Sequence, residues 1–453
     1  MKVSKFGGTS LASAAQMKKV VQIVLADLER KVVVVSAPGK RFASDQKVTD
    51  LLITCAEEKL RTGKIETDSL LAILQRYEEI TTGLELPPTL LDELESRLRH
   101  RLAQPIVEKA PWIDGVKATG EEASSLILAA LLRKQGQDAT AIDPKEAGML
   151  LTSEYGQARV LPEAYERLSS LCEREGILVF PGFYGFTSEG NLVTFPRGGS
   201  DITGSILAKA VGAQLYENFT DVDAVYSVSP AYVANPKPIS VLTYQEMREL
   251  SYAGFSVFND EALQPAFQAK IPVCIKNTNN PSAPGTMVVF EREAKPSTIA
   301  GIACDHPFCS ILVSKYLLHR EIGFGRRLLE IIEDEGISYE HSPSGIDQIS
   351  VILRQDSLSA EKEVRIRQRI EEELQVDHIE VVHDLSMIMV VGEGMRSYPG
   401  IAAKATNALA QAEVNIVMIN QGSSEVSMMF GIKQCDEHRA ISSLYQAFFE
   451  ENN

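Results

Sequence analysis

The chain has 453 residues, enough for about three domains of ~150 residues, and its 44% hydrophobic and 23% charged content is typical of a globular protein. Its 45 Lys and Arg residues face 61 Asp and Glu residues, which gives a formal net charge of -16. This charge argues against nucleic acid and anionic membranes as partners, because both attract basic surfaces.

Neither the N-terminus nor the apolar segments indicate export or membrane insertion. The opening MKVSKFGGTS is unlike a signal peptide, and apolar runs such as Val32–Val35 are too short to span a bilayer. The six cysteines are dispersed without the spacing of metal ligands. We therefore expect a cytoplasmic protein without metal ligands of its own.

Residues 1–290 alternate between strand-like and helix-like segments. Met1–Phe6 and the β-branched run Lys31–Val35 have the pattern of short strands, and Ala12–Leu28 places apolar residues at helical spacing. Residues 50–110 are rich in Leu, Glu and Arg with a helical period, which predicts a helical insertion. Further elements are expected at Ala139–Ile142, Ile177–Phe180, Ile202–Val211, Gln214–Phe219 and Val273–Ile275. This order predicts an α/β fold, with a mostly parallel sheet covered by helices on both faces.

The last third of the chain contains an internal repeat. An offset of 77 residues superposes Gly323 on Gly400 and Ser350 on Ser427, and each copy has the order strand, glycine loop, helix, strand, turn, strand. We therefore expect two small α+β units rather than one domain with accidental similarity. The expected division is a domain over 1–292 and a region over 298–453, with units at about 308–380 and 385–453 that residues 298–306 could interleave.

The loop after the first strand, Lys5-Phe6-Gly7-Gly8-Thr9-Ser10, has the composition of an anion site. Glycines let backbone N–H groups approach an anion, the following helix adds a partial positive charge, and Lys5 adds a full one. A tight turn with a capping hydroxyl explains the same residues equally well when the loop is taken alone.

A second glycine loop, Arg197-Gly198-Gly199-Ser200-Asp201, precedes another helical run. Ser200 and Asp201 suit helix capping, but a turn needs no guanidinium, so Arg197 favours capture of a carboxylate or phosphate.

Two further loops carry polar groups. Thr119-Gly120-Glu121-Glu122 is expected to open a helix, where Glu121 either faces the helix dipole or receives a substrate ammonium. The segment Phe219–Tyr226 follows a strand, and its polar groups either bind the ribose and base of a nucleotide or form an Asx-type turn.

In combination these loops resemble the aspartate kinases of the amino acid kinase family. The resemblance is carried by KFGGTS, FPRGGSDITG and FTDVDAVY, and INQGSSE (Ile419–Glu425) is similar to a signature of the ACT domains that follow these kinases. It implies an amino acid kinase fold followed by two ACT-type units. The implied reaction converts ATP and L-aspartate to ADP and 4-phospho-L-aspartate, the first step of lysine, threonine and methionine synthesis.

The resemblance also implies roles for individual residues. Lys5, Arg197 and Asp201 would be catalytic, with Mg²⁺ bridging ATP oxygens and few or no protein ligands to the metal. The implied aspartate-binding residues are Ser36, Thr49, Glu121, Phe183, Arg197 and Ser200. The implied ATP-binding residues are Lys5, Gly7, Gly8, Thr220, Asp221, Tyr226 and Ser256.

Three positions depart from the family pattern. Ala224 replaces a usual glycine, Ser229-Pro230 replaces an Asp-Pro pair, and Ser256 occupies the place of a usual lysine. The last change removes a positive nucleotide contact. The missing lysine motivates one alternative to aspartate kinase activity, an amino-acid sensor that has lost turnover. The other alternative is an amino acid kinase with a glutamate-type substrate, against which the tandem sensor units and the position of Glu121 argue.

The repeated glycine loops predict where a regulatory amino acid binds. Backbone at Gly323-Phe324-Gly325 suits an α-carboxylate, and Glu340 in the segment Ser338-Tyr339-Glu340 suits an ammonium. The alternative is that these glycines only shape turns in a dimerisation platform. We expect lysine and/or threonine as the effector, and a homodimer or larger homo-oligomer by resemblance.

Overall fold

The computed structural model of the chain describes residues 1–255, 260–293, 298–396 and 398–450. The chain divides into two compact units. The first comprises Met1–Val225, Pro238–Tyr244 and Val257–Arg292. The second comprises Tyr226–Lys237, Gln245–Ser256 and Glu293–Asn453, so two short segments before residue 292 belong with the C-terminal region.

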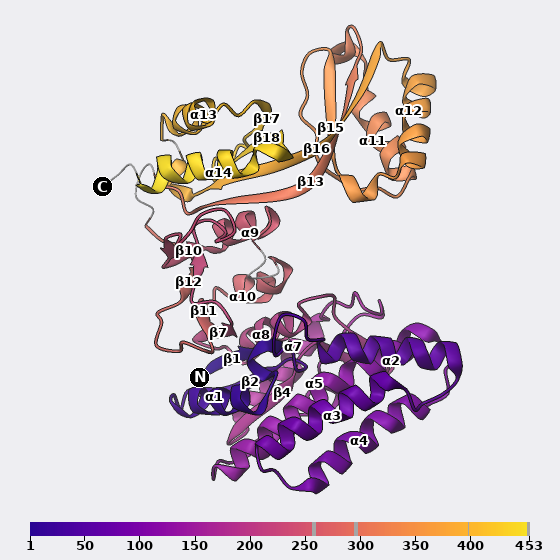
Figure 1. The fold of residues 1–453 in the computed structure, drawn as a ribbon, viewed down its shortest axis with the longest axis vertical. Coiled ribbons are helices and arrows are strands. Elements are labelled where there is room, and N and C mark those ends of the chain that lie inside the picture. Colours follow the sequence, from indigo (N-terminus) through magenta and orange to yellow (C-terminus); the bar gives the residue numbers. More distant parts are fainter. Residues whose placement is uncertain (256–259, 294–297, 397, 451–453) are drawn as a thin grey trace. The chain divides into compact units, whose positions relative to one another are not determined.

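An eight-stranded sheet with the order β10-β12-β11-β7-β1-β2-β4-β3 forms the centre of the first unit (Figure 1). All neighbouring strands from β11 to β3 pair in parallel, and only the β11–β12 pair of this sheet is antiparallel in the described residues. The predicted mostly parallel sheet is therefore present. Its strands are β1 (Lys2–Phe6), β2 (Arg30–Val35), β3 (Ala139–Ala141), β4 (Ile177–Pro181), β7 (Leu215–Thr220), β10 (Val241–Thr243), β11 (Val273–Asn277) and β12 (Thr286–Val289).

The central strands are apolar because helices cover both of their faces. Val32–Val35 of β2 are fully buried, as expected for a strand in the middle of a parallel sheet. The helices of the first unit are α1 (Ala14–Leu25), α2 (Val48–Thr62), α3 (Asp68–Gly83), α4 (Pro88–Ala103), α5 (Lys109–Lys134), α6 (Pro144–Ala147), α7 (Pro162–Ser169), α8 (Gly199–Ala210) and α10 (Gln264–Gln268). A 3₁₀ turn, η1 (Gly8–Leu11), joins β1 to α1, and a short hairpin of β5 (Tyr184–Phe186) and β6 (Leu192–Thr194) follows β4.

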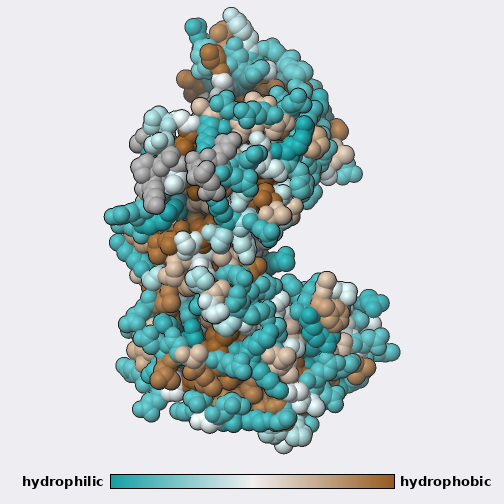
Figure 2. Space-filling view, turned by 60° about the vertical axis from the view of Figure 1, so that its left-hand side comes forward, coloured by the Kyte–Doolittle hydropathy of each residue, from teal (hydrophilic) through white to brown (hydrophobic). Residues whose placement is uncertain are grey.

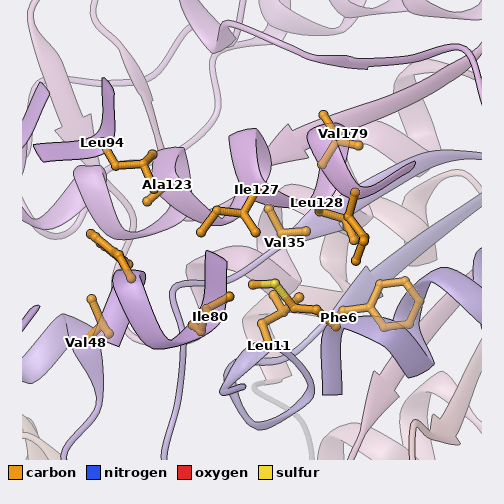
Figure 3. Packing of buried hydrophobic residues seen from close by; sticks show 14 of the residues in the cluster. Phe6, Leu11, Val35, Val48, Ile80, Leu94, Ala123, Ile127, Leu128 and Val179 are labelled. Carbon is orange, nitrogen blue, oxygen red and sulfur yellow. The ribbon is translucent and has the colours of Figure 1, made fainter. Parts of the chain in front are cut away.

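The main hydrophobic core lies between one face of the sheet and helices α1 to α5. In Figure 3, Phe6 of β1 and Val35 of β2 lie beside Ile127 and Leu128 of α5. Helix α5 is buried along most of its length, which fixes it firmly against the sheet. A residue on α5 that points toward the carboxyl ends of the strands is therefore held in a rigid frame.

A six-stranded antiparallel sheet with the order β14-β15-β13-β16-β18-β17 organises the second unit. Its strands are β13 (Gly301–Ser314), β14 (Tyr339–His341), β15 (Gln348–Arg354), β16 (His378–Val391), β17 (Ile416–Asn420) and β18 (Ser427–Lys433). Its helices are α11 (Phe324–Asp334), α12 (Ala360–Leu374), α13 (Ile401–Gln411) and α14 (Glu437–Tyr445), with α9 (Tyr244–Tyr252) added by one of the short segments. Figure 1 shows β13 and β16 as long strands that run through both parts of this sheet.

The long strands link the two copies of the repeat. Gly301–Asp305 of β13 pairs with the second half of β16, whereas Phe308–Ser314 pairs with β15 and with the first half of β16. Separate hydrophobic cores lie under α11 and α12 and under α13 and α14. Gly323 and Gly400 precede α11 and α13 with φ of 79° and 100°, so the repeated glycines occupy left-handed backbone that favours glycine.

Hydrophilic residues cover most of the face shown in Figure 2, with hydrophobic residues between them. Across the described ranges, every helix is too short or too polar to cross a membrane.

Candidate active site

The carboxyl ends of the central parallel strands meet at one edge of the first sheet. Phe6 pairs with Val35 on one side and with Phe219 on the other, and Val35 pairs with Pro181. The residues that follow these positions are Gly7, Ser36, Gly182 and Thr220. Ligands of open α/β sheets bind at this edge, so the topology alone brings four predicted loops together.

The predicted phosphate loop packs closely against the loop after β2. The Gly39 N–H donates to the Gly8 carbonyl at 2.8 Å, and a Cβ on Gly39 would lie 2.5 Å from the Gly8 carbonyl carbon. Only glycine fits such a close approach of two backbones. The Gly7 N–H donates to the Phe219 carbonyl at 3.1 Å, which ties the same loop to β7.

Lys5 lies beneath this loop and is buried. Its Nζ lies 2.5 Å from Oδ1 of Asp201, in the first turn of α8. A Cβ on Gly7 would lie 3.6 Å from the same Nζ. The structure therefore places the predicted catalytic lysine and aspartate in direct contact beside the glycine backbone.

The Arg197–Asp201 loop enters α8 through Gly198, whose φ of 86° needs glycine. Ser200 is buried against Gly182, where any added Cβ would lie 2.7 Å from the Ser200 Cβ. Arg197 is exposed. This close packing fixes the start of α8 against the loop after β4.

Phe183 has a φ of 75°, which is unusual for a residue with a side chain. Its N–H donates to the Thr203 hydroxyl oxygen at 3.0 Å, and that hydroxyl donates to the Gly199 carbonyl at 2.8 Å. Thr203 thus links the strained Phe183 backbone to α8. Sequence reasoning missed this role, because a threonine in a helix usually bonds only within the helix.

Glu121 lies in the middle of α5, so the prediction that it opens a helix is wrong. The helix begins at Lys109 because the apolar pattern continues through Trp112 and Val116 into the core. Glu121 is buried; its Oε1 accepts from the Ala37 N–H at 3.0 Å, and its Oε2 has no hydrogen-bond partner. Burial raises the pKa of Glu121 to about 8, against the opposing effects of the Ala37 N–H and Lys117.

The loop between β2 and α2 carries Ser36 and, just inside α2, Thr49; both are half-buried. Arg76 of α3 holds this loop in place through two contacts. Its Nη1 donates to the Gly39 carbonyl at 3.0 Å, and its Nη2 lies 2.8 Å from Asp45 Oδ2. This buried pair is a second feature that sequence reasoning missed, because an arginine in a charged helix normally indicates a solvated face.

The loop after β7 holds the predicted nucleotide residues. The Thr220 carbonyl accepts from the Thr278 N–H at 2.9 Å, and Asp221 is exposed beside it. Asn277 donates to Asp223 at 2.7 Å and so braces the same loop. Tyr226 begins the first segment of the second unit, and Ser256 lies outside the described residues.

The predicted effector residues lie in the second unit. Phe324 is buried in the core under α11, so the Gly323-Phe324-Gly325 loop offers backbone rather than that side chain. Ser338 and Tyr339 are exposed at the edge strand β14. Glu340 lies 3.2 Å from Arg354 and accepts a hydrogen bond from Tyr252 of α9. Glu340 is thus already engaged by partners from two elements.

The protein side chains at this site offer few ligands for a magnesium ion. Asp201 Oδ1 accepts from Asn218 at 2.6 Å in addition to its contact with Lys5. Within the described part of the chain, no three His, Cys, Asp or Glu side chains gather in a metal-binding group. This donor set fits a metal held chiefly by the phosphate oxygens of a nucleotide.

Comparisons with known proteins agree with this geometry. The model of the amino acid kinase family matches residues 1–277, and that of an ACT domain matches residues 388–448. Aspartokinase 3 of Bacillus subtilis is 56% identical over 449 residues, covering 99% of both chains.

Two solved proteins show the same architecture over the whole chain. Clostridium acetobutylicum aspartate kinase is 37% identical with a TM-score of 0.86, covering 99% of both chains. E. coli aspartokinase III, solved with aspartate and ADP and with lysine and aspartate, is 25% identical with a TM-score of 0.77, covering 99% of this chain and 100% of that one.

The chain belongs to the amino acid kinase family. Within that family it is a member of the aspartate kinases. The resemblance and the fold class expected from the motifs are therefore confirmed.

Proposed function

We propose that this chain transfers the γ-phosphoryl group of ATP to the side-chain carboxylate of L-aspartate, giving ADP and 4-phospho-L-aspartate. The observation that carries the proposal is the contact of buried Lys5 with Asp201 beside the Gly7-Gly8 backbone. This arrangement puts a fixed positive charge where a phosphoryl group would pass along the sheet edge. The reaction would be the first step of lysine, threonine and methionine synthesis.

Aspartate would be held by opposite charges at its two α-substituents. Arg197 would bind the α-carboxylate, and the unpartnered Oε2 of Glu121 would receive the ammonium. Ser36, Thr49, Phe183 and Ser200 would line the remainder of this subsite. With both α-substituents fixed, only the side-chain carboxylate can reach the phosphoryl group.

ATP would bind at the loops after β1 and β7. Gly7 and Gly8 would offer backbone N–H groups to the phosphates, and Thr220, Asp221 and Tyr226 would contact the nucleoside. Ser256 supplies no positive charge at its position, so Lys5 and the start of α8 would carry the neutralisation. Bound Mg²⁺ would shield the negative charges of the phosphate oxygens.

The acceptor needs no general base. An aspartate side chain has a reference pKa of about 3.9 and is already ionised at neutral pH. Catalysis then depends on aligning two anions and offsetting their repulsion, and Lys5 lies where it can do both.

The second unit would regulate this activity. E. coli aspartokinase III has been solved with lysine and aspartate in a T-state, which favours lysine as the effector here, with threonine second. We place the effector carboxylate at the backbone of Gly323-Phe324-Gly325 and its ammonium at Glu340, with Ser338 and Tyr339 beside it. The active protein would be a homodimer or larger homo-oligomer.

The effector site is tested by titrating lysine and threonine against the wild type and Glu340→Ala. We expect inhibition of the wild type and at least a roughly tenfold weaker response of the variant, at unchanged uninhibited kcat. Glu371→Ala, at an exposed position of α12, is a control that removes the same side chain and should respond as the wild type does. A wild type insensitive to both amino acids would leave the second unit without a regulatory role.

The catalytic proposal is tested by ADP release in a coupled assay with aspartate, and with glutamate in a parallel reaction. We expect turnover with aspartate and little with glutamate, whose longer side chain misplaces the attacking oxygen. Preference for glutamate would identify a different amino acid kinase. Absence of turnover with both would identify a sensor without catalysis, which the missing positive charge at Ser256 keeps as the second candidate.

A further inference from the structure

Asn218 lies directly beside Lys5 on the sheet. The two residues are register partners on the parallel strands β1 and β7, and side chains at paired positions point to the same face. On this face α8 packs, and it presents Asp201 between them. Ser4 and Glu217, one position earlier on each strand, bond to each other on the opposite face.

Asp201 Oδ1 forms an ion pair with Lys5 and accepts a hydrogen bond from Asn218. Lys5 Nζ lies 2.5 Å away and Asn218 Nδ2 donates at 2.6 Å, while the Tyr216 hydroxyl donates to the Asp201 carbonyl at 3.1 Å. Asn218 is 4% exposed. Two adjacent residues of the same face of β7 therefore hold Asp201, one by its backbone and one by its carboxylate.

The buried amide at position 218 needs polar partners, and in the structure these are Asp201 and the neighbouring Tyr216 hydroxyl. Its register neighbour on β11 is Ile275, which offers no polar side chain. A carboxylate oxygen that accepts two donors attracts each of them less strongly than an oxygen that accepts one. An uncharged donor can share this oxygen without adding a second cation that would compete for the phosphoryl group.

We propose that Asn218 is a positioning residue for phosphoryl transfer, which acts through Asp201 to keep Lys5 available to the transferring group. Without the amide, Lys5 would be the main partner of Asp201 Oδ1 and would be held more tightly by it. Lys5 would then engage the transition state less well, although neither substrate would lose a contact. This inference rests on the proposed kinase activity and concerns kcat rather than binding.

The test replaces Asn218 by leucine, which is similar in size and suits the neighbouring Ile275. We expect Asn218→Leu to lower kcat about tenfold, with KM for aspartate and for ATP changed less than about twofold. Ser4→Ala is the matched control, because it removes a buried hydrogen bond of the same strand pair on the opposite face. It should lower the melting temperature and leave kcat as it is.

A double-mutant cycle with Asp201→Asn separates positioning from a general structural role. If Asn218 acts through Asp201, adding Asn218→Leu to Asp201→Asn lowers kcat by less than about twofold further. A full second tenfold loss would overturn the proposal, as would a normal kcat for Asn218→Leu alone. If Asn218→Leu fails to fold, Asn218→Ala removes the amide donor without adding a charge and takes its place in the cycle. An inactive wild type would refute the proposed kinase activity instead, so the two failures are distinct.

Discussion

Glu121 combines a stability cost with a binding role, and both can be measured through one substitution, Glu121→Gln. Burial raises the pKa of this carboxyl from 4.5 to about 8, and Oε2 has no partner in the folded chain. The folded state therefore binds the proton more tightly than the unfolded state does. Between pH 4.5 and 8, the unfolded chain ionises at this position while the folded chain resists ionisation.

This difference in proton binding sets the direction in which the free energy of unfolding changes with pH. The contribution of Glu121 to wild-type stability is largest below pH 4.5 and is lost as pH rises through the window from 4.5 to 8. At 1.36 kcal/mol per pKa unit, the loss reaches about 3 kcal/mol at pH 7. Glutamine does not ionise, so the free energy of unfolding of Glu121→Gln should rise relative to the wild type by about this amount between pH 4.5 and pH 7.

Aspartate binding should show the opposite pH dependence. The ammonium needs the ionised carboxylate, and below a pKa of about 8 only a minor fraction of the free enzyme has it. KM for aspartate should therefore fall by more than roughly tenfold from pH 6 to pH 8, because binding must draw on the ionised fraction. In Glu121→Gln this dependence should disappear and KM should be high throughout.

Denaturant unfolding and initial rates over pH 5–8 measure both effects. Glu122→Gln is a matched control, since Glu122 is the next residue of α5 and pairs outward with Arg97 at 2.5 Å. It should keep the wild-type pH dependence of KM. A wild-type KM that stays flat from pH 6 to 8, or that keeps its slope in Glu121→Gln, would refute the assignment of the ammonium to Glu121.

Three further substitutions test the remaining parts of the site. Lys5→Ala should lower kcat by about 100-fold or more with a smaller change in aspartate KM, because its charge acts on the transition state; a normal kcat would contradict its role. Arg197→Lys should raise aspartate KM about tenfold in steady-state assays, since the planar fork is lost, whereas weakened ATP binding alone would place Arg197 on the nucleotide side. Arg76→Leu should reduce the free energy of unfolding by about 1–3 kcal/mol in denaturant titrations, because the Gly39 carbonyl loses a buried donor while Asp45 keeps Arg41 as a partner; a loss under about 0.5 kcal/mol would refute the bracing role.

The strand ends and glycine loops could be predicted because their signals are local. A β-branched run followed by Ser36, or a strand followed by Gly7 and Gly8, carries its structure in adjacent residues. Parallel pairing then brings the loops to one edge without further information. The repeat in the last third was equally visible, since Gly323 and Gly400 recur with the same flanking pattern.

Contacts between distant segments could not be predicted from such signals. Asn218 and Thr203 act only once β7, α8 and the Phe183 loop are packed, and Arg76 reaches Gly39 only because α3 lies under the loop after β2. Taken from the sequence alone, Gly120 indicates a loop rather than the interior of a helix. For this reason the prediction wrongly begins a helix at Thr119-Gly120-Glu121-Glu122. In the structure that glycine lies against Ala37 and Leu52, where an added Cβ would lie 2.7 Å from the Ala37 Cβ, so its small size serves packing.

Trapping of the product tests the central claim most directly. An acyl phosphate reacts with hydroxylamine, so incubation with ATP, Mg²⁺, aspartate and hydroxylamine should give the β-hydroxamate of aspartate in amounts equal to the ADP released. The same reaction with Lys5→Ala should give little of either. ADP release without hydroxamate, or hydroxamate on the α-carboxylate, would contradict transfer to the aspartate side chain.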